Sequence, residues 1–518
     1  MKLGLAAVEI ESFRSVVAQR LGLNFDDARL EFLGDVARGR MEATGCGLFS
    51  LYLRRVAAGE REEIRALAEQ LTVNETYFFR YADHFRAFAE VVVPARIHAR
   101  GDDRRLRILS AGCSSGEEAY SLAIFIQSRL RQLASWDISI HGIDVNASMV
   151  GKAVSAKYSA WSLRETPAEI QSRYFRRDGS DFILDATVRS QVTFEERNLL
   201  EEDPRFWLSD TFDVVFCRNV TMYFTGEVAS AVIARVANST ASRGFLFLGH
   251  AENLRGVSQD FHLRHTHGTF YYQRREAHDM ERVTASQSPS TGGSLQSRAP
   301  ASVESADSWF NIIRMASERV TDLTQTTLES TANGGESVRA RASSPAASPR
   351  SRACGRTAAI ELMRKERFAE AMGLLEELPA ESQVDPDTQL LVAALLTNRG
   401  ELQKAERVCR HVLELDELNA GAHYLMALCR EHAGDRDGAR EHDQAATYLD
   451  SAFALPHLHL GLLAKRTADM ETARREFGRA LPLLAREDAS RILLFGGGFT
   501  RAALVEFCRA ELRSCDAA

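Results

Sequence analysis

The sequence predicts an α/β fold with a Rossmann-like, doubly wound parallel sheet, an all-helical region before it and an all-α region after it. Three observations support this. Residues 106–121 read as strand, tight turn and helix, apolar strands alternate with helices from there to residue 275, and alanines recur at a fixed spacing near the carboxyl end. The regions expected are a helical domain at 1–90, an α/β domain at 91–276 with a small β insertion at 158–192, a linker at 277–353 and a helical array at 354–518.

Composition narrows the class of protein. The 518 residues are 45% apolar and 26% charged, as in ordinary globular proteins of several domains. A net charge of -7 argues against nucleic acid as the main partner. We find no apolar run suited to direct membrane insertion and no signal peptide. Eight cysteines lack the CxxC spacing of zinc or redox sites, so we expect no metal and a cytoplasmic location.

The first helical region carries apolar residues at helical spacing. The pattern predicts helices over 8–21, 24–39, 49–58 and 60–71. Residues 74–80 (NETYFFR) follow, where Asn74 and Thr76 offer hydrogen-bonding groups and Arg80 could hold a carboxylate with two hydrogen bonds. The simpler interpretation of this segment alone is a helix cap followed by aromatic core residues.

The turn between the first strand and its helix predicts a ligand site. Gly112 and Gly116 lack a Cβ, so the backbone can bend sharply and a ligand can approach it. The turn lacks the full GxGxxG of dinucleotide-binding proteins and the GK[ST] of a P-loop. An adenosine ligand without a pyrophosphate fits better, and S-adenosylmethionine is the common one. The alternative is a generic tight turn with no ligand.

Further polar residues follow later strands. Residues 138–144 form the second strand and end in Asp144, whose carboxylate can accept both hydroxyls of a ribose. A helix at 148–156 comes next, and residues 175–184 then indicate two short strands around a glycine turn.

The main sheet resumes at 192–199, followed by a buried strand at 212–224 that carries Arg218 and Asn219 and ends near Tyr223. Polar residues at the carboxyl ends of parallel strands lie where such sheets bind ligands. Further strands are expected at 244–252 and 268–272.

The carboxyl-terminal region contains an internal repeat. Residues 277–353 are rich in Ser, Thr, Ala, Arg and Gly, which indicates a flexible linker. After it, Ala371, Ala405, Ala439 and Ala473 are spaced by 34 residues each. A 34-residue period with a small residue in the second helix of each pair is typical of tetratricopeptide repeats, which bind peptides or proteins.

Four motifs in order give the chain a specific resemblance. They are NETYFFR (74–80), SAGCSSGEEAYS (110–121), FDVVFCRNVTMYF (212–224) and GHAENL (249–254). With them the chain resembles the CheR-type chemoreceptor glutamate O-methyltransferases, joined here to a tetratricopeptide tail. The likeness covers about residues 8–275 and implies a methyltransferase domain that binds S-adenosylmethionine and releases S-adenosylhomocysteine.

The resemblance also assigns residues. It implies that Arg80 contacts S-adenosylmethionine, that Arg80 and Tyr223 lie near the transferred methyl group, and that Asp144 holds the ribose. The remaining cofactor contacts that it implies are Asn74, Thr76, Glu118, Asn198, Leu199, Arg218 and Asn219. Thr221 stands where the family usually has an aliphatic residue. The substrate would be the cytoplasmic helical domain of a chemoreceptor, and recruitment to membrane receptor arrays would follow.

Methyl transfer to a glutamate requires the protein mainly to align the carboxylate with the methyl group. A glutamate side chain, with a pKa near 4.3, is already a nucleophile at neutral pH, so neither a metal nor a general base is required. We expect Arg80 to orient a carboxylate and the Tyr223 hydroxyl to hydrogen-bond near the reacting centre; the alternative for Tyr223 is core packing beside Phe224. A small-molecule methyltransferase and a ligand-regulated repeat scaffold are the competing functions.

Overall fold

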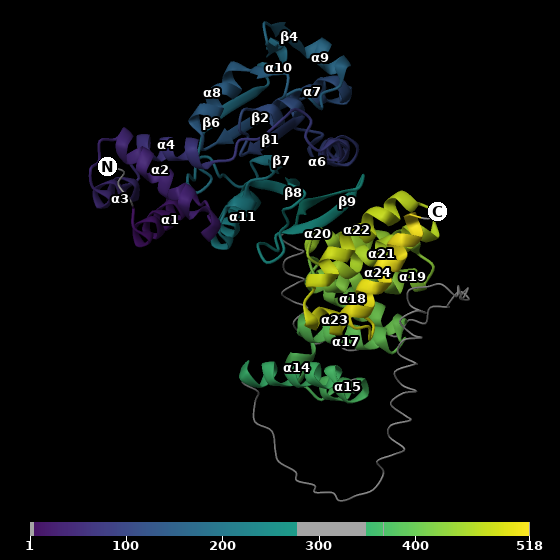
Figure 1. Ribbon diagram of the computed structural model, residues 1–518. Coiled ribbons are helices and arrows are strands. Elements are labelled where there is room, and N and C mark those ends of the chain that lie inside the picture. Colours follow the sequence, from purple (N-terminus) through teal and green to yellow (C-terminus); the bar gives the residue numbers. More distant parts are fainter. Residues whose placement is uncertain (1–4, 277–348, 366, 517–518) are drawn as a thin grey trace, which may run out of the picture. The chain divides into compact units, whose positions relative to one another are not determined.

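The computed structural model describes residues 5–276, 349–365 and 367–516 (Figure 1). The chain divides into two compact units, Met1–Arg282 and Val283–Ala518. The predicted linker at 277–353 lies mostly outside the described residues, and its last five residues belong to helix α14, which begins at Pro349.

Four helices form the amino-terminal domain, as predicted. They are α1 (Ala7–Leu21), α2 (Leu30–Ala43), α3 (Phe49–Ala58) and α4 (Arg61–Leu71). The second helix was expected from residue 24 but begins at Leu30, after the 3-10 turn η1 (Asp27–Arg29). The residues before this turn are extended and not helical, because Leu23 forms a β-bridge with Phe224 and the Asn24 N–H donates to the carbonyl of Tyr223 at 2.7 Å. These contacts tie the helical domain to the sheet domain.

The central sheet has seven strands in the order β6-β2-β1-β7-β8-β10-β9. The strands are β1 (Arg105–Ala111), β2 (Asp137–Asp144), β6 (Val192–Glu196), β7 (Phe212–Cys217), β8 (Thr240–Leu248), β9 (Phe261–Thr266) and β10 (Thr269–Arg274). The first five are parallel, and β9 and β10 pair antiparallel at one edge. The chain runs from β1 to β2 on one side and returns to β7 on the other, so the order switches at β1 and β7, where doubly wound sheets bind ligands.

Helices connect and cover these strands. They are α5 (Ala82–Ala87), the π-turn η2 (Phe88–Val92), α6 (Val93–Arg100), α7 (Glu117–Arg129), η3 (Arg131–Leu133), α8 (Ala147–Ser155), the 3-10 turn η4 (Thr221–Tyr223) and α11 (Gly226–Ser239). A buried ion pair fixes α6 to the sheet: Arg96 Nη2 lies 2.6 Å from Asp213 Oδ1, and the other Asp213 oxygen accepts the Arg107 N–H of β1 at 2.9 Å. Both partners of the pair are nearly inaccessible to solvent.

The expected β insertion is present and has one strand more than predicted. Its strands are β3 (Lys157–Ser159), β5 (Asp181–Leu184) and β4 (Phe175–Asp178), in that spatial order, with helices α9 (Ala168–Tyr174) and α10 (Ala186–Arg189). The insertion is anchored by Phe78, which is fully buried and packs edge-on against the rings of Tyr158 and Phe175.

The second unit is a helical array with its own core. Its helices are α14 (Pro349–Arg364), α15 (Phe368–Glu376), α16 (Ala380–Gln383), α17 (Pro386–Asn398), α18 (Leu402–Leu415), α19 (Ala420–His432), α20 (Arg436–Leu449), α21 (Ala454–Arg466), α22 (Met470–Arg486), α23 (Ala489–Phe495) and α24 (Arg501–Asp516). The four alanines of the 34-residue period lie in α15, α18, α20 and α22, and each is 0% exposed. Their burial confirms that the period marks close helix packing.

The turns of the array follow the same period. Gly400 and Gly434 have φ of 75° and 83°, in the left-handed region that favours glycine. Ala468 stands at the next equivalent position and adopts φ of 59°. The third turn therefore keeps the geometry although its residue carries a Cβ.

Candidate active site

The turn after β1 lies at the switch in strand order and requires its glycines. Gly112, Ser114 and Gly116 have φ of 74°, 48° and 89°. A Cβ on Gly112 would overlap the Val220 side chain, and one on Gly116 would lie 2.9 Å from the Phe194 ring. The turn is thus packed against two other segments as well as sharply bent.

Asp144 holds this turn in place from the end of β2. One carboxylate oxygen accepts the Ser114 N–H at 2.8 Å and the other accepts the Asn146 N–H at 2.8 Å. Burial raises the pKa of Asp144 above its ordinary value, and these N–H groups oppose the rise. Each carboxylate oxygen has a second lone pair, so Asp144 can still accept hydroxyl groups of a ligand.

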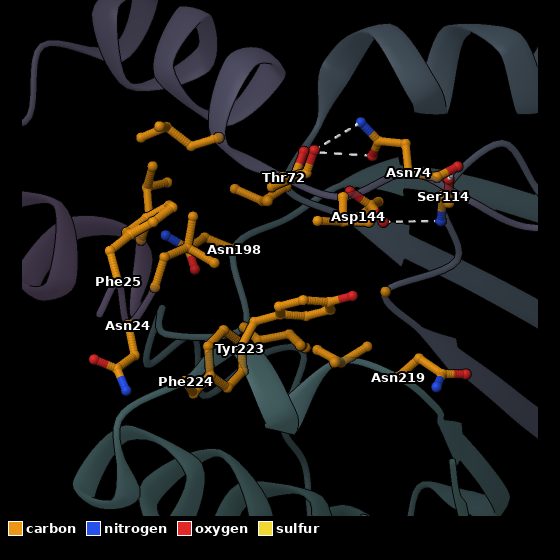
Figure 2. Close-up of a pocket in the computed structure, with 18 of the residues that line it drawn as sticks. Asn24, Phe25, Thr72, Asn74, Ser114, Asp144, Asn198, Asn219, Tyr223 and Phe224 are labelled. Carbon is orange, nitrogen blue, oxygen red and sulfur yellow. Dashed lines mark hydrogen bonds between the residues drawn. The ribbon is translucent and has the colours of Figure 1, made fainter. Parts of the chain in front are cut away.

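Two pockets hold the predicted site residues, and the larger of these two opens beside this turn with an empty volume of about 830 Å³. Six predicted site residues line it: Asn74, Asp144, Asn198, Leu199, Asn219 and Tyr223. Figure 2 shows the Tyr223 ring on the opposite side of the pocket from Asp144. The site thus combines apolar walls with a few polar groups, as adenosine-binding pockets require.

The amino-terminal domain supplies part of the wall, which was not predicted. Leu21, Leu23, Asn24 and Phe25 line the larger pocket from the end of α1 and the segment after it. These residues carry no motif in the sequence. The β-bridge between Leu23 and Phe224 and the hydrogen bond from Asn24 to Tyr223 bring them to the sheet domain.

A smaller pocket of about 500 Å³ holds the remaining predicted residues. Thr76, Arg80, Glu118 and Arg218 line it. The walls shared by both pockets are Val73, Gly112, Ser114 and Asn219. All ten predicted residues therefore lie around two adjoining cavities.

Arg80 and Tyr223, however, do not line the same cavity. Tyr223 belongs to the larger pocket and Arg80 to the smaller one. Asn219 lines both pockets and lies between their two sets of residues. A reacting group served by Arg80 and Tyr223 together would therefore lie close to Asn219.

A buried ion pair gives the smaller pocket its charge. Arg218 Nη1 lies 3.3 Å from Glu118 Oε2, and Glu118 Oε1 accepts the Ser110 hydroxyl at 2.6 Å. Burial raises the pKa of Glu118 and lowers that of Arg218, and in each case the partner's charge opposes the shift. Arg218 Nε is buried and has no hydrogen-bond partner within the described part of the chain. It is therefore a donor that a ligand carboxylate could satisfy.

The segment that carries Arg80 is a strained loop. Phe79 and Tyr81, on either side of Arg80, have φ of 59° and 67°. The Arg80 guanidinium donates to the Glu75 carbonyl at 3.2 Å and lies 5.2 Å from the centre of the Tyr81 ring. These two contacts hold the guanidinium against its own loop.

The interpretation of Asn74 and Thr76 as helix caps is wrong. Both residues lie in the loop between α4 and α5, and the residue that caps α5 is Tyr81. The Asn74 amide instead donates to the carbonyl of Thr72 at 3.2 Å, as Figure 2 shows. The aromatic part of that interpretation is right for Phe78, which is fully buried.

Tyr223 both packs and faces the cavity. It lies on the turn η4, and its ring packs with Phe224 against the core of the amino-terminal domain. Its carbonyl accepts the Asn24 N–H, but within the described residues no group hydrogen-bonds to its hydroxyl. The hydroxyl is thus available to a ligand or substrate.

Comparison with known proteins identifies the domain around these pockets. The family description "CheR methyltransferase, SAM binding domain" matches residues 74–270. Chemotaxis protein methyltransferase 2 of Vibrio cholerae is 33% identical over 276 residues, which cover 52% of this chain and 94% of that protein. The chain belongs to the CheR methyltransferase family. It is therefore an S-adenosylmethionine-dependent methyltransferase, and the matched range contains all ten predicted site residues.

Two further relatives match different shares of this chain. The chemotaxis protein methyltransferase of Salmonella typhimurium is 30% identical over 51% of this chain and 90% of its own length. The "Probable biofilm formation methyltransferase WspC" of Pseudomonas putida is 27% identical over 471 residues, 91% of this chain and 97% of that protein. A methyltransferase thus exists that resembles this chain along both units.

Two features are absent from the part of the chain that the structure describes. No group of three or more His, Cys, Asp or Glu side chains there is arranged to hold a metal ion. No helix there combines the length and apolar character needed to cross a lipid bilayer.

Proposed function

We propose that this CheR methyltransferase transfers the methyl group of S-adenosylmethionine to glutamate side chains in the cytoplasmic helical domain of a chemoreceptor, and that its helical repeats bind a protein partner. The observation that supports the proposal most is the pair of adjoining pockets at the strand switch. One has apolar walls and an acid, and the other has a buried arginine with an unpaired N–H.

The two pockets fit the two halves of the methyl donor. In the larger one, Asp144 would accept the ribose hydroxyls while Leu199 and Tyr223 pack against the adenosine. In the smaller one, Arg218 and Arg80 would hold the amino-acid carboxylate, and Glu118 would accept its ammonium group. The sulfur would then lie near the shared wall at Gly112 and Asn219.

The reaction needs alignment and a dry site. A glutamate carboxylate oxygen of the receptor forms a bond to the methyl carbon as the carbon–sulfur bond breaks, and the bonding electron pair stays on sulfur; no proton moves. The substrate is ionised at neutral pH, so no base is needed. Tyr223 would donate its free hydroxyl to that carboxylate and orient it, and Leu23 and Phe25 would exclude water.

Transfer of tritium from labelled S-adenosylmethionine to receptor-containing membranes tests this proposal. We expect label on the receptor that is released by mild base, because methyl esters hydrolyse readily. A receptor whose candidate glutamates are replaced by alanine is the matched control and should stay unlabelled. Label on a small metabolite would instead identify a small-molecule methyltransferase, and no label with retained binding of S-adenosylhomocysteine would identify a scaffold.

A further inference from the structure

One buried carboxylate binds the whole segment that follows strand β7. Glu252 is 3% exposed and follows β8, about thirty residues after the segment that it binds. The hydrogen bonds that its two oxygens accept include those from the backbone N–H groups of Asn219, Val220, Met222 and Gly249 and from the hydroxyl of Thr221. Four of these five donors belong to the segment that leads to Tyr223.

The segment is held in a conformation that it would not keep unaided. Asn219 has φ of 59°, in the left-handed region, and the next residues form the turn η4. Such strained residues persist only where surrounding contacts fix them. Glu252 accepts hydrogen bonds from the strained residue itself and from the three residues that follow it, so it fixes the start of the turn directly.

Gly249 also packs closely against the Glu252 carboxylate. A Cβ on Gly249 would lie 2.6 Å from Glu252 Oε2 and 2.8 Å from the side-chain amide nitrogen of Asn219. Any residue but glycine would therefore push the carboxylate or Asn219 away. The hydroxyl of Thr221 completes the set at 2.8 Å, which gives a physical role to the residue where the sequence departs from the usual family pattern.

We infer that Glu252 is a positioning residue for methyl transfer: by binding the backbone from Asn219 to Met222 it fixes Asn219 at the wall shared by the two pockets and Tyr223 across the larger one. The inference rests on the proposed function for its catalytic consequence. Its consequence for ligand binding is independent, because Asn219, Val220 and Tyr223 all line the larger pocket.

The substitution Glu252→Gln tests this role because it keeps the shape of the side chain. The amide replaces one acceptor oxygen with a donor that faces other N–H groups, so the turn must shift. A misplacement on the order of 1 Å lowers turnover about 100-fold, and we expect a loss in kcat of that size with a smaller rise in KM for the receptor. The dissociation constant of S-adenosylhomocysteine, measured by calorimetry, should rise about 10-fold, as for one lost hydrogen bond.

Two milder variants keep the inference open to refutation if Glu252→Gln does not fold. Thr221→Val removes one of the five donors and should reproduce the same loss at a smaller size. Gly249→Ala keeps Glu252 in the sequence but crowds its carboxylate and Asn219, and should lower kcat and ligand affinity together. Glu252→Asp, which retains the charge on a shorter side chain, should restore part of the activity lost in Glu252→Gln.

The matched control is Glu63→Gln, at an acid that is equally buried but lies in α4 and binds Arg40 and Tyr52. This variant should lose stability without losing kcat or ligand affinity. The inference is overturned if Glu252→Gln, Thr221→Val and Gly249→Ala lose only stability, as Glu63→Gln does. If the unsubstituted chain transfers no methyl group to receptors, the proposed function fails, while the S-adenosylhomocysteine titrations still decide whether Glu252 positions the pocket.

Discussion

Removing the hydroxyl of Tyr223 isolates a single interaction in the proposed reaction. Tyr223→Phe deletes one oxygen that has no partner within the described residues, and it keeps the ring that packs with Phe224 against the amino-terminal core. We therefore expect the free energy of unfolding to stay unchanged. The adenosine contacts of the ring also remain, so the affinity for S-adenosylhomocysteine should change less than about threefold, within the range of a lost weak contact.

The expected loss in turnover follows from the partner of the hydroxyl. A hydrogen bond to a charged group contributes about 1.5–3 kcal/mol, and each 1.36 kcal/mol corresponds to a factor of ten. If the hydroxyl orients the receptor carboxylate, kcat should fall about 10- to 150-fold at saturating methyl donor. Initial rates of base-labile methyl incorporation, together with calorimetric titration, separate the two quantities.

The matched control for this substitution is Tyr271→Phe. The Tyr271 hydroxyl accepts the Thr266 hydroxyl at 3.2 Å in the β9–β10 hairpin, away from both pockets. Its loss should lower stability slightly and leave turnover as it was. Equal losses of turnover and cofactor affinity in Tyr223→Phe would refute the orienting role and leave Tyr223 as a packing residue of the pocket wall.

Three further substitutions test other parts of the structure. Asp144→Asn should raise the dissociation constant of S-adenosylhomocysteine about 10- to 150-fold in calorimetry, because a charged acceptor of two backbone N–H groups is lost; an unchanged value would separate Asp144 from the ligand. Asp213→Ala leaves Arg96 buried without its charge partner and should lower the unfolding free energy of the first unit by about 3–5 kcal/mol in urea, whereas a loss below about 1 kcal/mol would show that the pair is solvated. Ala468→Gly should raise the stability of the repeat unit by about 1 kcal/mol, since the left-handed turn suits glycine as at Gly434, and destabilisation would contradict this reading of the turn.

Local patterns in the sequence predicted the sheet and the ligand edge well. Parallel strands align their carboxyl ends, so Asp144 at the end of β2 and Asn219 after β7 had to lie at the same edge of the sheet. The burial of Ala371 and Ala405 followed from their period alone, because paired helices approach closely only at small residues. One edge strand, β9, was missed although Phe261 and Leu263 alternate with polar residues there.

Long-range contacts were beyond prediction. Nothing near Leu23 indicates that it pairs with Phe224, and this contact moves the start of α2 and makes the helical domain a wall of the pocket. Likewise, Glu252 sits in a motif of the sequence, but only the fold brings it to the backbone of Asn219. The separation of Arg80 from Tyr223 into two cavities also depends on how the loop before α5 crosses the sheet edge.

Calorimetric titration of the full chain with S-adenosylhomocysteine tests the central claim most directly. The two adjoining pockets predict one ligand bound per chain, with affinity weakened about 10- to 150-fold in Asp144→Asn and retained in Tyr271→Phe. The absence of any binding heat at several temperatures, or binding that Asp144→Asn leaves unchanged, would contradict the assignment of these pockets to the methyl donor.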